Sequence, residues 1–194
     1  MTRISISQDD ALLVVDVQNC FLPGGSLGVK DGDQVVPVLN RLIPRFPLVI
    51  FSRDWHPADH CSFATPPAFT DKSWPEHCVQ HTPGAEFHPD LLIPPLHVVV
   101  SKGRDKNLEA YSAFDRTGLA DLLRRLAVRR VFIGGLATDY CVRFSALDAL
   151  KAGFAAVVVT DACRGVNLPP GSADAALTEL AAAGATLVRS EEIE

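Results

Sequence analysis

Six short runs of β-branched and aliphatic residues constrain the fold of this chain more than any other feature. They cover residues 11–17, 47–54, 97–102, 129–136, 155–162 and 185–190. Runs of this length without polar alternation are typical of strands that are buried on both faces. Several segments between these runs have apolar residues at helical spacing, and most of them begin with an Asp, Thr or Ser that could cap a helix. These segments are 33–46, 117–128, 138–151 and 172–183. The alternation predicts a three-layer α/β/α fold with a central, mostly parallel sheet, as in Rossmann-like proteins.

One stretch interrupts the alternation. Residues 54–95 are rich in Pro and aromatic residues, lack periodicity, and contain both Trp residues and five of the six His residues. Irregular connections of this length in compact proteins are usually binding loops or disordered, and this composition argues against disorder. Because 194 residues fit one domain, we expect a single domain over 1–194 with a long metal- and substrate-binding loop at about 54–95.

Charge and hydropathy exclude several classes of protein. The formal net charge is −5 and the basic residues are scattered, so we expect no nucleic-acid partner and no binding to an anionic membrane. No apolar run approaches the roughly 20 residues that span a bilayer, and the first ten residues lack a secretory core. We therefore predict a cytoplasmic protein. Its five cysteines show no CxxC spacing, and we expect them to be reduced.

Polar residues from distant parts of the chain close the predicted strands. Asp16 lies near the end of the first, Asp54 closes the second, Lys102 closes the third, and Cys141 lies just beyond the fourth. Parallel strands deliver their carboxyl ends to one edge, where ligands of open α/β sheets bind. The sequence therefore predicts that these four side chains share a site.

Cys141 is the candidate nucleophile. We expect it in the first turn of the helix that follows GGLATDY, where the helix dipole and a nearby lysine would make the thiol more acidic than a free one. The thiolate is the form that attacks carbonyl carbon. The backbone N–H groups of Ala137 and Cys141 could hold a developing oxyanion. A packed, inert cysteine is the alternative.

Asp16 needs a partner because it interrupts an apolar run. Lys102 is the natural one, and the pair could accept the thiol proton and later pass it to a leaving amine. A purely structural ion pair is the alternative.

The long loop offers metal ligands and aromatic walls. Asp54 and His56 point the same way in an extended segment, and His77 could complete a site for a divalent ion, with zinc favoured and iron or manganese open. Whether His60 or Ser62 also contributes stays open. The aromatic side chains that could contact a flat substrate ring are Phe21, Trp74 and Tyr111.

These motifs together resemble a known family. The chain is similar over nearly its whole length to the nicotinamidases (pyrazinamidases) of the isochorismatase-like cysteine hydrolase superfamily, on the segments VVDVQNCFLPGGSL, RDWHPADHCSF, SWPEHCVQHTPGAEFHPDL and GGLATDYCVR. The resemblance implies a catalytic triad of Asp16, Lys102 and Cys141, metal ligands at Asp54, His56 and His77, and a cis peptide between Leu136 and Ala137. In one departure, Cys20 stands where relatives commonly carry an acidic residue, which adds a thiol near the site.

The resemblance implies an amidohydrolase of NAD salvage that acts on linear amides. We expect it to convert nicotinamide to nicotinate and ammonia through a thioester on Cys141, and to accept pyrazinamide. The ring would bind between Phe21 and Trp74 with its nitrogen at the metal. A sister amidohydrolase acting on a carbamoyl or maleamate-type amide is the nearest alternative, and a nucleotide-binding module is disfavoured because neither Gly pair has phosphate-loop spacing. Homo-oligomerisation is possible, since relatives often self-associate.

Overall fold

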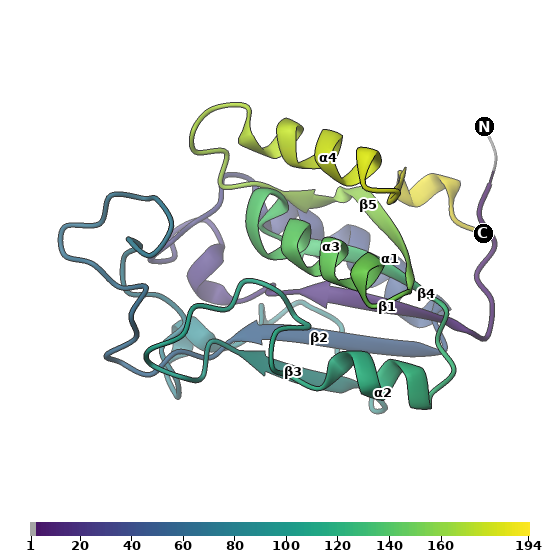
Figure 1. Cartoon of the computed structure of the whole chain (residues 1–194), viewed down its shortest axis with the longest axis horizontal. Helices are drawn as coiled ribbons and strands as arrows, with labels where there is room; N and C mark the ends of the chain where they lie inside the picture. Colours follow the sequence, from purple (N-terminus) through teal and green to yellow (C-terminus); the bar gives the residue numbers. More distant parts are fainter. Residues whose placement is uncertain (1–2) are drawn as a thin grey trace.

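A six-stranded parallel sheet organises the computed structural model, which describes residues 3–194 (Figure 1). The strand order is β3-β2-β1-β4-β5-β6, and every neighbouring pair is parallel. The strands are β1 (Asp10–Val15), β2 (Leu48–Asp54), β3 (Val98–Lys102), β4 (Arg130–Leu136), β5 (Ala155–Arg164) and β6 (Thr186–Val188). All six predicted strands are confirmed, and the order reverses between β1 and β4, which is where open α/β sheets bind ligands.

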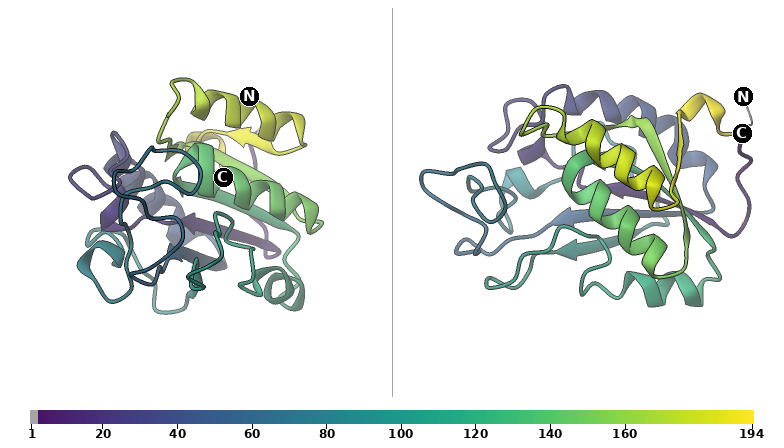
Figure 2. Two further views of the ribbon diagram at one scale, coloured as in Figure 1. Left: turned by 60° about the vertical axis from the view of Figure 1, so that its left-hand side comes forward. Right: turned by 45° about the horizontal axis from the view of Figure 1, so that its top comes forward.

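Helices cover both faces of the sheet, as the three-layer prediction required (Figures 1 and 2). The α-helices are α1 (Val35–Leu42), α2 (Leu119–Arg125), α3 (Arg143–Lys151) and α4 (Ser172–Ala182). Leu12 and Val14 of β1 pack on the side of α1, whereas Leu13 and Val15 pack on the side of the other three helices. Successive side chains of a strand point to opposite faces, so a strand between two helical layers is apolar at every position. This explains why β1 is buried throughout.

The helix starts differ from the prediction. None of the four α-helices begins with a side-chain cap, and α2 and α4 begin instead after Gly118 and Gly171, both in the left-handed conformation. Residues Thr138–Val142 form a π-helical turn, η5, that leads into α3. Short 3-10 turns complete the list: η1 (Asn19–Phe21), η2 (Gly32–Gln34), η3 (Ile43–Arg45), η4 (Pro83–Ala85) and η6 (Ser190–Glu192). Within residues 3–194, no helix has both the length and the apolar character to cross a bilayer.

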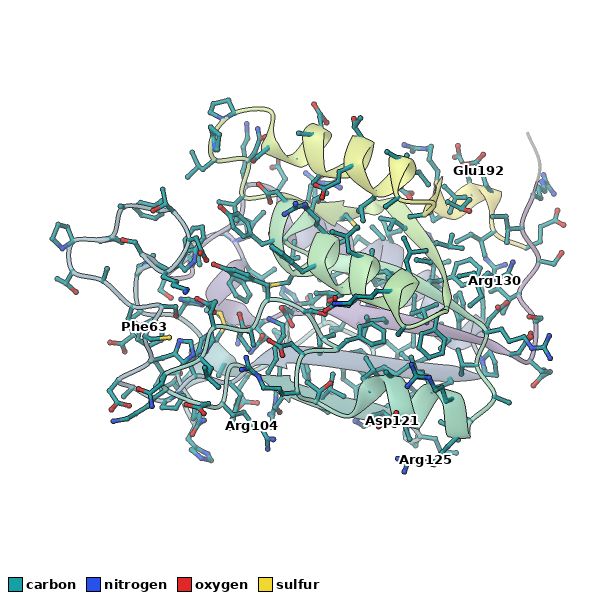
Figure 3. The ribbon with its side chains drawn as sticks, in the orientation of Figure 1. Phe63, Arg104, Asp121, Arg125, Arg130 and Glu192 are labelled. Carbon is teal, nitrogen blue, oxygen red and sulfur yellow. A yellow bond between two sulfur atoms is a disulfide. The ribbon has the colours of Figure 1, made fainter. Side chains whose placement is uncertain are left out.

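The irregular segment between β2 and β3 lies beyond the carboxyl ends of the strands. Figure 3 shows Phe63 of this segment at one end of the molecule, and Arg130, the first residue of β4, toward the other. The backbone of the segment between β2 and β3 is held by isolated β-bridges, such as His56 with Val79 and Phe63 with Trp74. The segment is therefore ordered by local pairing, and it covers the edge of the sheet where the candidate site was expected.

The prediction that every cysteine is reduced is wrong for one pair. Cys20 of η1 and Cys78 of the long segment form a disulfide, with their Cα atoms 5.7 Å apart. The two residues are 58 positions apart in the sequence, and only the fold of the long segment over η1 brings them together. Cys61, Cys141 and Cys163 are free thiols.

Candidate active site

Two neighbouring strands end on a charged pair. Asp54 is the last residue of β2, Lys102 is the last residue of β3, and the two are partners in the register of these strands. Asp16 follows β1 directly and adopts a left-handed backbone, with φ at 48°. Its carboxylate accepts a hydrogen bond of 2.7 Å from the Ser52 hydroxyl. The sheet edge thus collects these charged side chains without help from the long segment.

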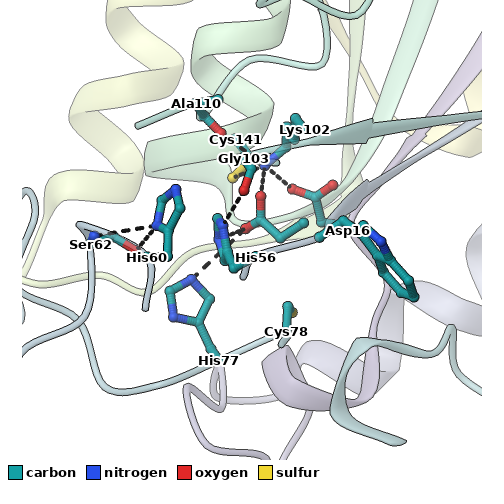
Figure 4. Close-up of polar contacts among 12 residues, drawn as sticks. Asp16, His56, His60, Ser62, His77, Cys78, Lys102, Gly103, Ala110 and Cys141 are labelled. Atoms are coloured by element: carbon teal, nitrogen blue, oxygen red, sulfur yellow. Dashed lines mark hydrogen bonds and ion pairs between the residues drawn. The ribbon is translucent and has the colours of Figure 1, made fainter. Parts of the chain in front are cut away.

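Lys102 is the hub of this edge (Figure 4). Its Nζ atom lies 2.8 Å from Oδ2 of Asp16, 2.5 Å from Oδ1 of Asp54 and 3.3 Å from Sγ of Cys141. All four residues are buried. Oδ2 of Asp16 has no partner of hydrogen-bonding geometry among the described residues despite its closeness to Nζ. This oxygen is therefore available to a proton, and the ligating atoms of Asp16 and Cys141 lie within 4.8 Å of each other.

Burial and charge set the protonation states of this cluster. Burial acts against the charge of Lys102, but Asp16 and Asp54 outweigh it and raise the pKa of the ammonium well above its ordinary value. Burial would also raise the pKa of Asp54, but Lys102 and His56 hold it well below its usual range. For Asp16, burial outweighs the attraction of Lys102, so its pKa is raised. A carboxyl group with a raised pKa beside a thiol is suited to moving a proton.

Cys141 lies in η5 rather than in the first turn of α3. Burial raises the pKa of its thiol well above the ordinary value; Lys102 opposes this rise, and the carboxylates of Asp16 and Asp54 add to it. The expectation of an acidified thiol is therefore wrong for this arrangement of the site. The helix dipole and one lysine do not compensate for the lost hydration of a thiolate beside two carboxylates. A thiol that is neutral at rest has to lose its proton to a nearby base before it attacks.

The turn that carries Cys141 also contains the candidate oxyanion donors. The peptide between Leu136 and Ala137 is cis, as the resemblance implied. The carbonyl oxygen of Ala137 accepts hydrogen bonds of 3.1 Å from the N–H groups of Tyr140 and Val142. These bonds fix the turn around the sulfur of Cys141.

Asp54, His56 and His77 form a candidate metal site, with one ligand atom of each within 4.8 Å of the others. Nε2 of His56 lies 3.6 Å from Oδ2 of Asp54, and Nε2 of His77 lies 3.9 Å from the same oxygen. Nδ1 of His56 is 3.0 Å from the carbonyl of Gly103, and Nδ1 of His77 is 2.8 Å from that of Pro75. A carbonyl can only accept, so each Nδ1 donates, and in the neutral form of each imidazole Nε2 keeps its lone pair.

The chemistry of this donor set fits a divalent cation. Two imidazoles, each oriented by its own backbone carbonyl, and a carboxylate are typical ligands of zinc and of other transition metals. Burial lowers the pKa of His77 to about 4, so its imidazole is neutral at neutral pH. Gly103 allows the close approach of His56, since a Cβ atom at this position would lie 2.3 Å from the imidazole ring. The geometry therefore supports a divalent metal at these three residues.

His60 and Ser62 lie outside the trio. Nδ1 of His60 is 2.7 Å from the Ser62 hydroxyl, and its Nε2 is 3.2 Å from the carbonyl of Leu108. Both ring nitrogens of His60 are thus already paired, although its ring lies only 4.1 Å from that of His56. His60 and Ser62 thus lie beside the trio and pair with each other, and neither belongs to the set whose ligand atoms lie within 4.8 Å of one another.

A cavity opens at Cys141. It is lined by Phe21, Leu27, Asp54, Trp74, His77, Glu109, Tyr111, Ala137, Tyr140, Cys141 and Val166. The structure therefore brings all three predicted ring contacts together with the thiol and two candidate metal ligands. The indole N–H of Trp74 donates to the Tyr111 hydroxyl over 3.0 Å, which fixes two of the aromatic walls. The apolar and aromatic lining suits a small aromatic ligand.

Sequence reasoning missed two features of this cavity. Glu109 lines it, although only Tyr111 was selected from the segment NLEAYSAF. Asp54 was predicted as a metal ligand alone, whereas its Oδ1 also pairs with Lys102. The predicted register of β2 and β3 could have suggested the second contact, because both residues end their strands.

Comparisons with known proteins agree with this geometry. Residues 10–192 match the isochorismatase domain. The chain is 45% identical to a nicotinamidase of Escherichia coli (strain K12) over 198 residues, which covers 91% of this chain and 93% of that protein. It is similar to the solved structure of PnC1 from L. infantum in complex with nicotinate, with a TM-score of 0.91, 38% identity, and 99% and 98% of the two chains covered. It also resembles the pyrazinamidase of Pyrococcus horikoshii in complex with zinc, with a TM-score of 0.85, 44% identity, and coverage of 93% and 99%.

Proposed function

Because the chain belongs to the isochorismatase family, we propose that it hydrolyses nicotinamide to nicotinate and ammonia, and that it accepts pyrazinamide. The nicotinamidase that shares 45% of its residues and the fold that it shares with a nicotinate-bound enzyme support this reaction. The observation that carries the proposal is the meeting of Asp16, Lys102 and Cys141 in one buried cluster, with Cys141 lining an aromatic cavity. Such an enzyme is an amidohydrolase of NAD salvage.

The proposed chemistry begins with Cys141. Asp16 takes the thiol proton as the sulfur attacks the carboxamide carbon. The ammonium of Lys102 stabilises the negative charges of Asp16, Asp54 and the forming thiolate. The N–H groups of Ala137 and Cys141 hold the oxyanion of the tetrahedral adduct. The carbon–nitrogen bond then breaks, and the leaving nitrogen takes the proton from Asp16 and departs as ammonia.

Hydrolysis of the thioester restores the site. Asp16 accepts a proton from a water molecule that attacks the thioester carbon, the carbon–sulfur bond breaks, and Cys141 recovers its proton as nicotinate leaves. The raised pKa of Asp16 supports both directions of transfer, because a carboxyl group with an unshifted pKa would give up its proton to solvent more readily.

We propose that Asp54, His56 and His77 hold the metal and that Phe21, Trp74 and Tyr111 contact the substrate. Among divalent ions we propose zinc first, because a similar pyrazinamidase binds it, with iron and manganese as the alternatives. When bound, the ion supplies a Lewis acid that orients the ring nitrogen of the substrate. The aromatic side chains of the cavity exclude water and keep the carboxamide over the sulfur.

The decisive experiment measures ammonia release from nicotinamide by the purified protein. Cys141→Ala should abolish release, whereas Cys163→Ala, a change at another buried free thiol, should leave it at the level of the unaltered enzyme. Normal release by Cys141→Ala would contradict the choice of nucleophile. Treatment with a chelator should stop release by the unaltered enzyme, and added zinc should restore it.

A panel of small amides tests the choice of substrate. Nicotinamide and pyrazinamide should be turned over faster than carbamoyl and maleamate-type amides, because only the first two are flat aromatic rings with a nitrogen that can reach the metal. Faster turnover of the non-aromatic amides would favour a sister amidohydrolase with the same triad. Residues 1–194 as a single hydrolase domain with a loop at about 54–95, a cytoplasmic location and a homo-oligomeric state remain predictions.

A further inference from the structure

The carboxyl group of Glu109 is incompletely satisfied. Its Oε1 accepts a hydrogen bond of 3.1 Å from the N–H group of Ala110, whereas its Oε2 is buried and has no hydrogen-bond partner among the described residues. A buried carboxylate oxygen without a partner destabilises a protein, since it has lost water and gained nothing in return. We therefore expect this oxygen to accept a hydrogen bond from a donor outside the protein, such as a bound water molecule.

The backbone on both sides of Glu109 is fixed. Three successive carbonyl groups each face a side chain: that of Leu108 faces His60 at 3.2 Å, that of Glu109 accepts from Arg116 at 2.8 Å, and that of Ala110 accepts from Lys102 at 3.4 Å. Two of these partners, His60 and Lys102, are themselves part of the site. The backbone that carries the Glu109 side chain is therefore fixed by Lys102 of the triad and by His60, whose ring lies beside that of His56.

The position of Glu109 points to the metal site. Its side chain lines the same cavity as Asp54 and His77, and it does not belong to the trio whose ligand atoms lie within 4.8 Å of one another. Glu109 is thus close to the site without being one of its direct ligands. A divalent ion with three protein ligands keeps open positions for water or substrate, and water on such an ion is a strong hydrogen-bond donor.

The charges of the buried site support the same conclusion. Asp16 and Asp54 share the single positive charge of Lys102. A bound dication adds two positive charges, so the set carries one excess positive charge when both imidazoles are neutral. Glu109 supplies the one further negative charge that balances it. Without the metal, the same carboxylate adds to an excess of negative charge, and burial raises its pKa.

We propose that Glu109 is a positioning residue that accepts a hydrogen bond from a water molecule on the metal held by Asp54, His56 and His77. The carboxylate thereby strengthens metal binding and orients the open coordination positions toward the cavity. The inference rests on the proposed function only in assuming that these three residues hold a divalent ion. It assigns a role to a side chain that forms no hydrogen bond or ion pair with the triad among the described residues.

The first test measures zinc affinity in the absence of any substrate. Metal-free protein competes with a chromophoric chelator for zinc, and Glu109→Gln is compared with Glu76→Gln, an exposed glutamate adjacent to His77. Glu109→Gln should weaken zinc binding about 10–100-fold, which is typical of carboxylates that support a metal site from the outside. Glu76→Gln should bind zinc as the unaltered protein does. Unchanged zinc affinity in Glu109→Gln would overturn the proposal.

The second test separates positioning from a structural role. Without metal, Glu109→Gln should unfold at the same temperature as the unaltered protein or at a higher one, because the substitution removes an uncompensated buried charge. Its stabilisation by added zinc should be smaller than that of the unaltered protein. A lower unfolding temperature of the metal-free variant would mean that Glu109 is a structural anchor and would contradict the proposal. Ammonia release is measured separately on the unaltered zinc-loaded enzyme, so a failure of the proposed function is distinguished from a failure of this inference.

Discussion

The two halves of the site are held in different ways. Asp16, Lys102 and Asp54 lie at or directly beyond the ends of parallel strands, and their positions follow from the strand register. His77 and Trp74 lie in the irregular segment between β2 and β3, which is held by single bridges, side-chain contacts and one disulfide. The strand-borne half is built from backbone hydrogen bonds that the whole sheet shares, whereas the loop-borne half depends on a few local contacts. The proposed triad and the proposed loop contacts to metal and substrate thus depend on separate parts of the chain.

The largest expected effect is on turnover, and it distinguishes a change in the strand-borne half from a change in the loop-borne half. Asp16→Asn should lower turnover by about 10⁴-fold, as removal of a triad carboxylate does elsewhere, with the zinc content unchanged. His77→Ala should instead weaken zinc binding and recover part of its turnover at high zinc concentration. Steady-state kinetics and metal analysis of both variants check this. Loss of zinc from Asp16→Asn would show that the two halves are not separable.

The second prediction concerns the stability of the strand-borne half. Lys102→Met should reduce the free energy of unfolding by about 3–5 kcal/mol, because two buried carboxylates lose their common cation. Denaturant unfolding measures this, with Lys106→Met as the control. Lys106 pairs with Asp59 at the surface, where water screens both charges, so its replacement should leave the free energy of unfolding nearly unchanged. Equal losses for the two lysines would contradict the importance of the buried cluster.

The third prediction concerns the loop-borne half. Cys20→Ser should lower the free energy of unfolding by about 2–4 kcal/mol, since the disulfide to Cys78 closes a long loop in the unfolded chain. The unaltered protein treated with a dithiol reductant should approach the stability of the variant. Cys61→Ser, which removes an exposed free thiol, serves as the control. A Cys20→Ser protein as stable as the oxidised unaltered protein would show that the disulfide contributes nothing to the free energy of unfolding.

The smallest expected effect concerns Cys141 itself. In metal-free protein, the rate of its alkylation by iodoacetamide should rise about tenfold per pH unit between about pH 7 and pH 9, because burial raises the pKa of the thiol. The sign follows from the thiolate being the reactive form, whose fraction grows with pH until the pKa is passed. Mass spectrometry distinguishes this site from Cys61 and Cys163. A rate that stops rising below about pH 8 would support the acidified thiol instead.

The sequence predicted the strand-borne half well because two simple rules apply to it. Buried parallel strands appear as apolar runs, and their carboxyl ends share one edge, which sufficed to bring Asp16, Lys102 and Cys141 together. The metal trio and the aromatic walls needed the resemblance as well, because the long segment has no period from which its path follows. The pairing of Cys20 with Cys78 and the position of Glu109 depend on that path, and neither was predicted.

The acidity of Cys141 shows a different limit. A helix start and a neighbouring lysine can be inferred from sequence, but the degree of burial and the number of carboxylates around the sulfur cannot. The helix caps were wrong for a related reason, since Gly118 and Gly171 begin their helices in a left-handed conformation that polar residues nearby did not reveal.

The pairing of Asp54 with Lys102 across β2 and β3 also determines which changes the chain can tolerate. Insertion or deletion of one residue within either strand would turn its terminal side chain to the opposite face of the sheet. Such a change in β3 would take the cation of Lys102 away from the candidate nucleophile, and such a change in β2 would take the carboxylate of Asp54 away from the candidate metal site. Length changes in evolution or engineering should therefore be confined to the segment between these strands, where new substrates can be accommodated while the strand lengths stay constant.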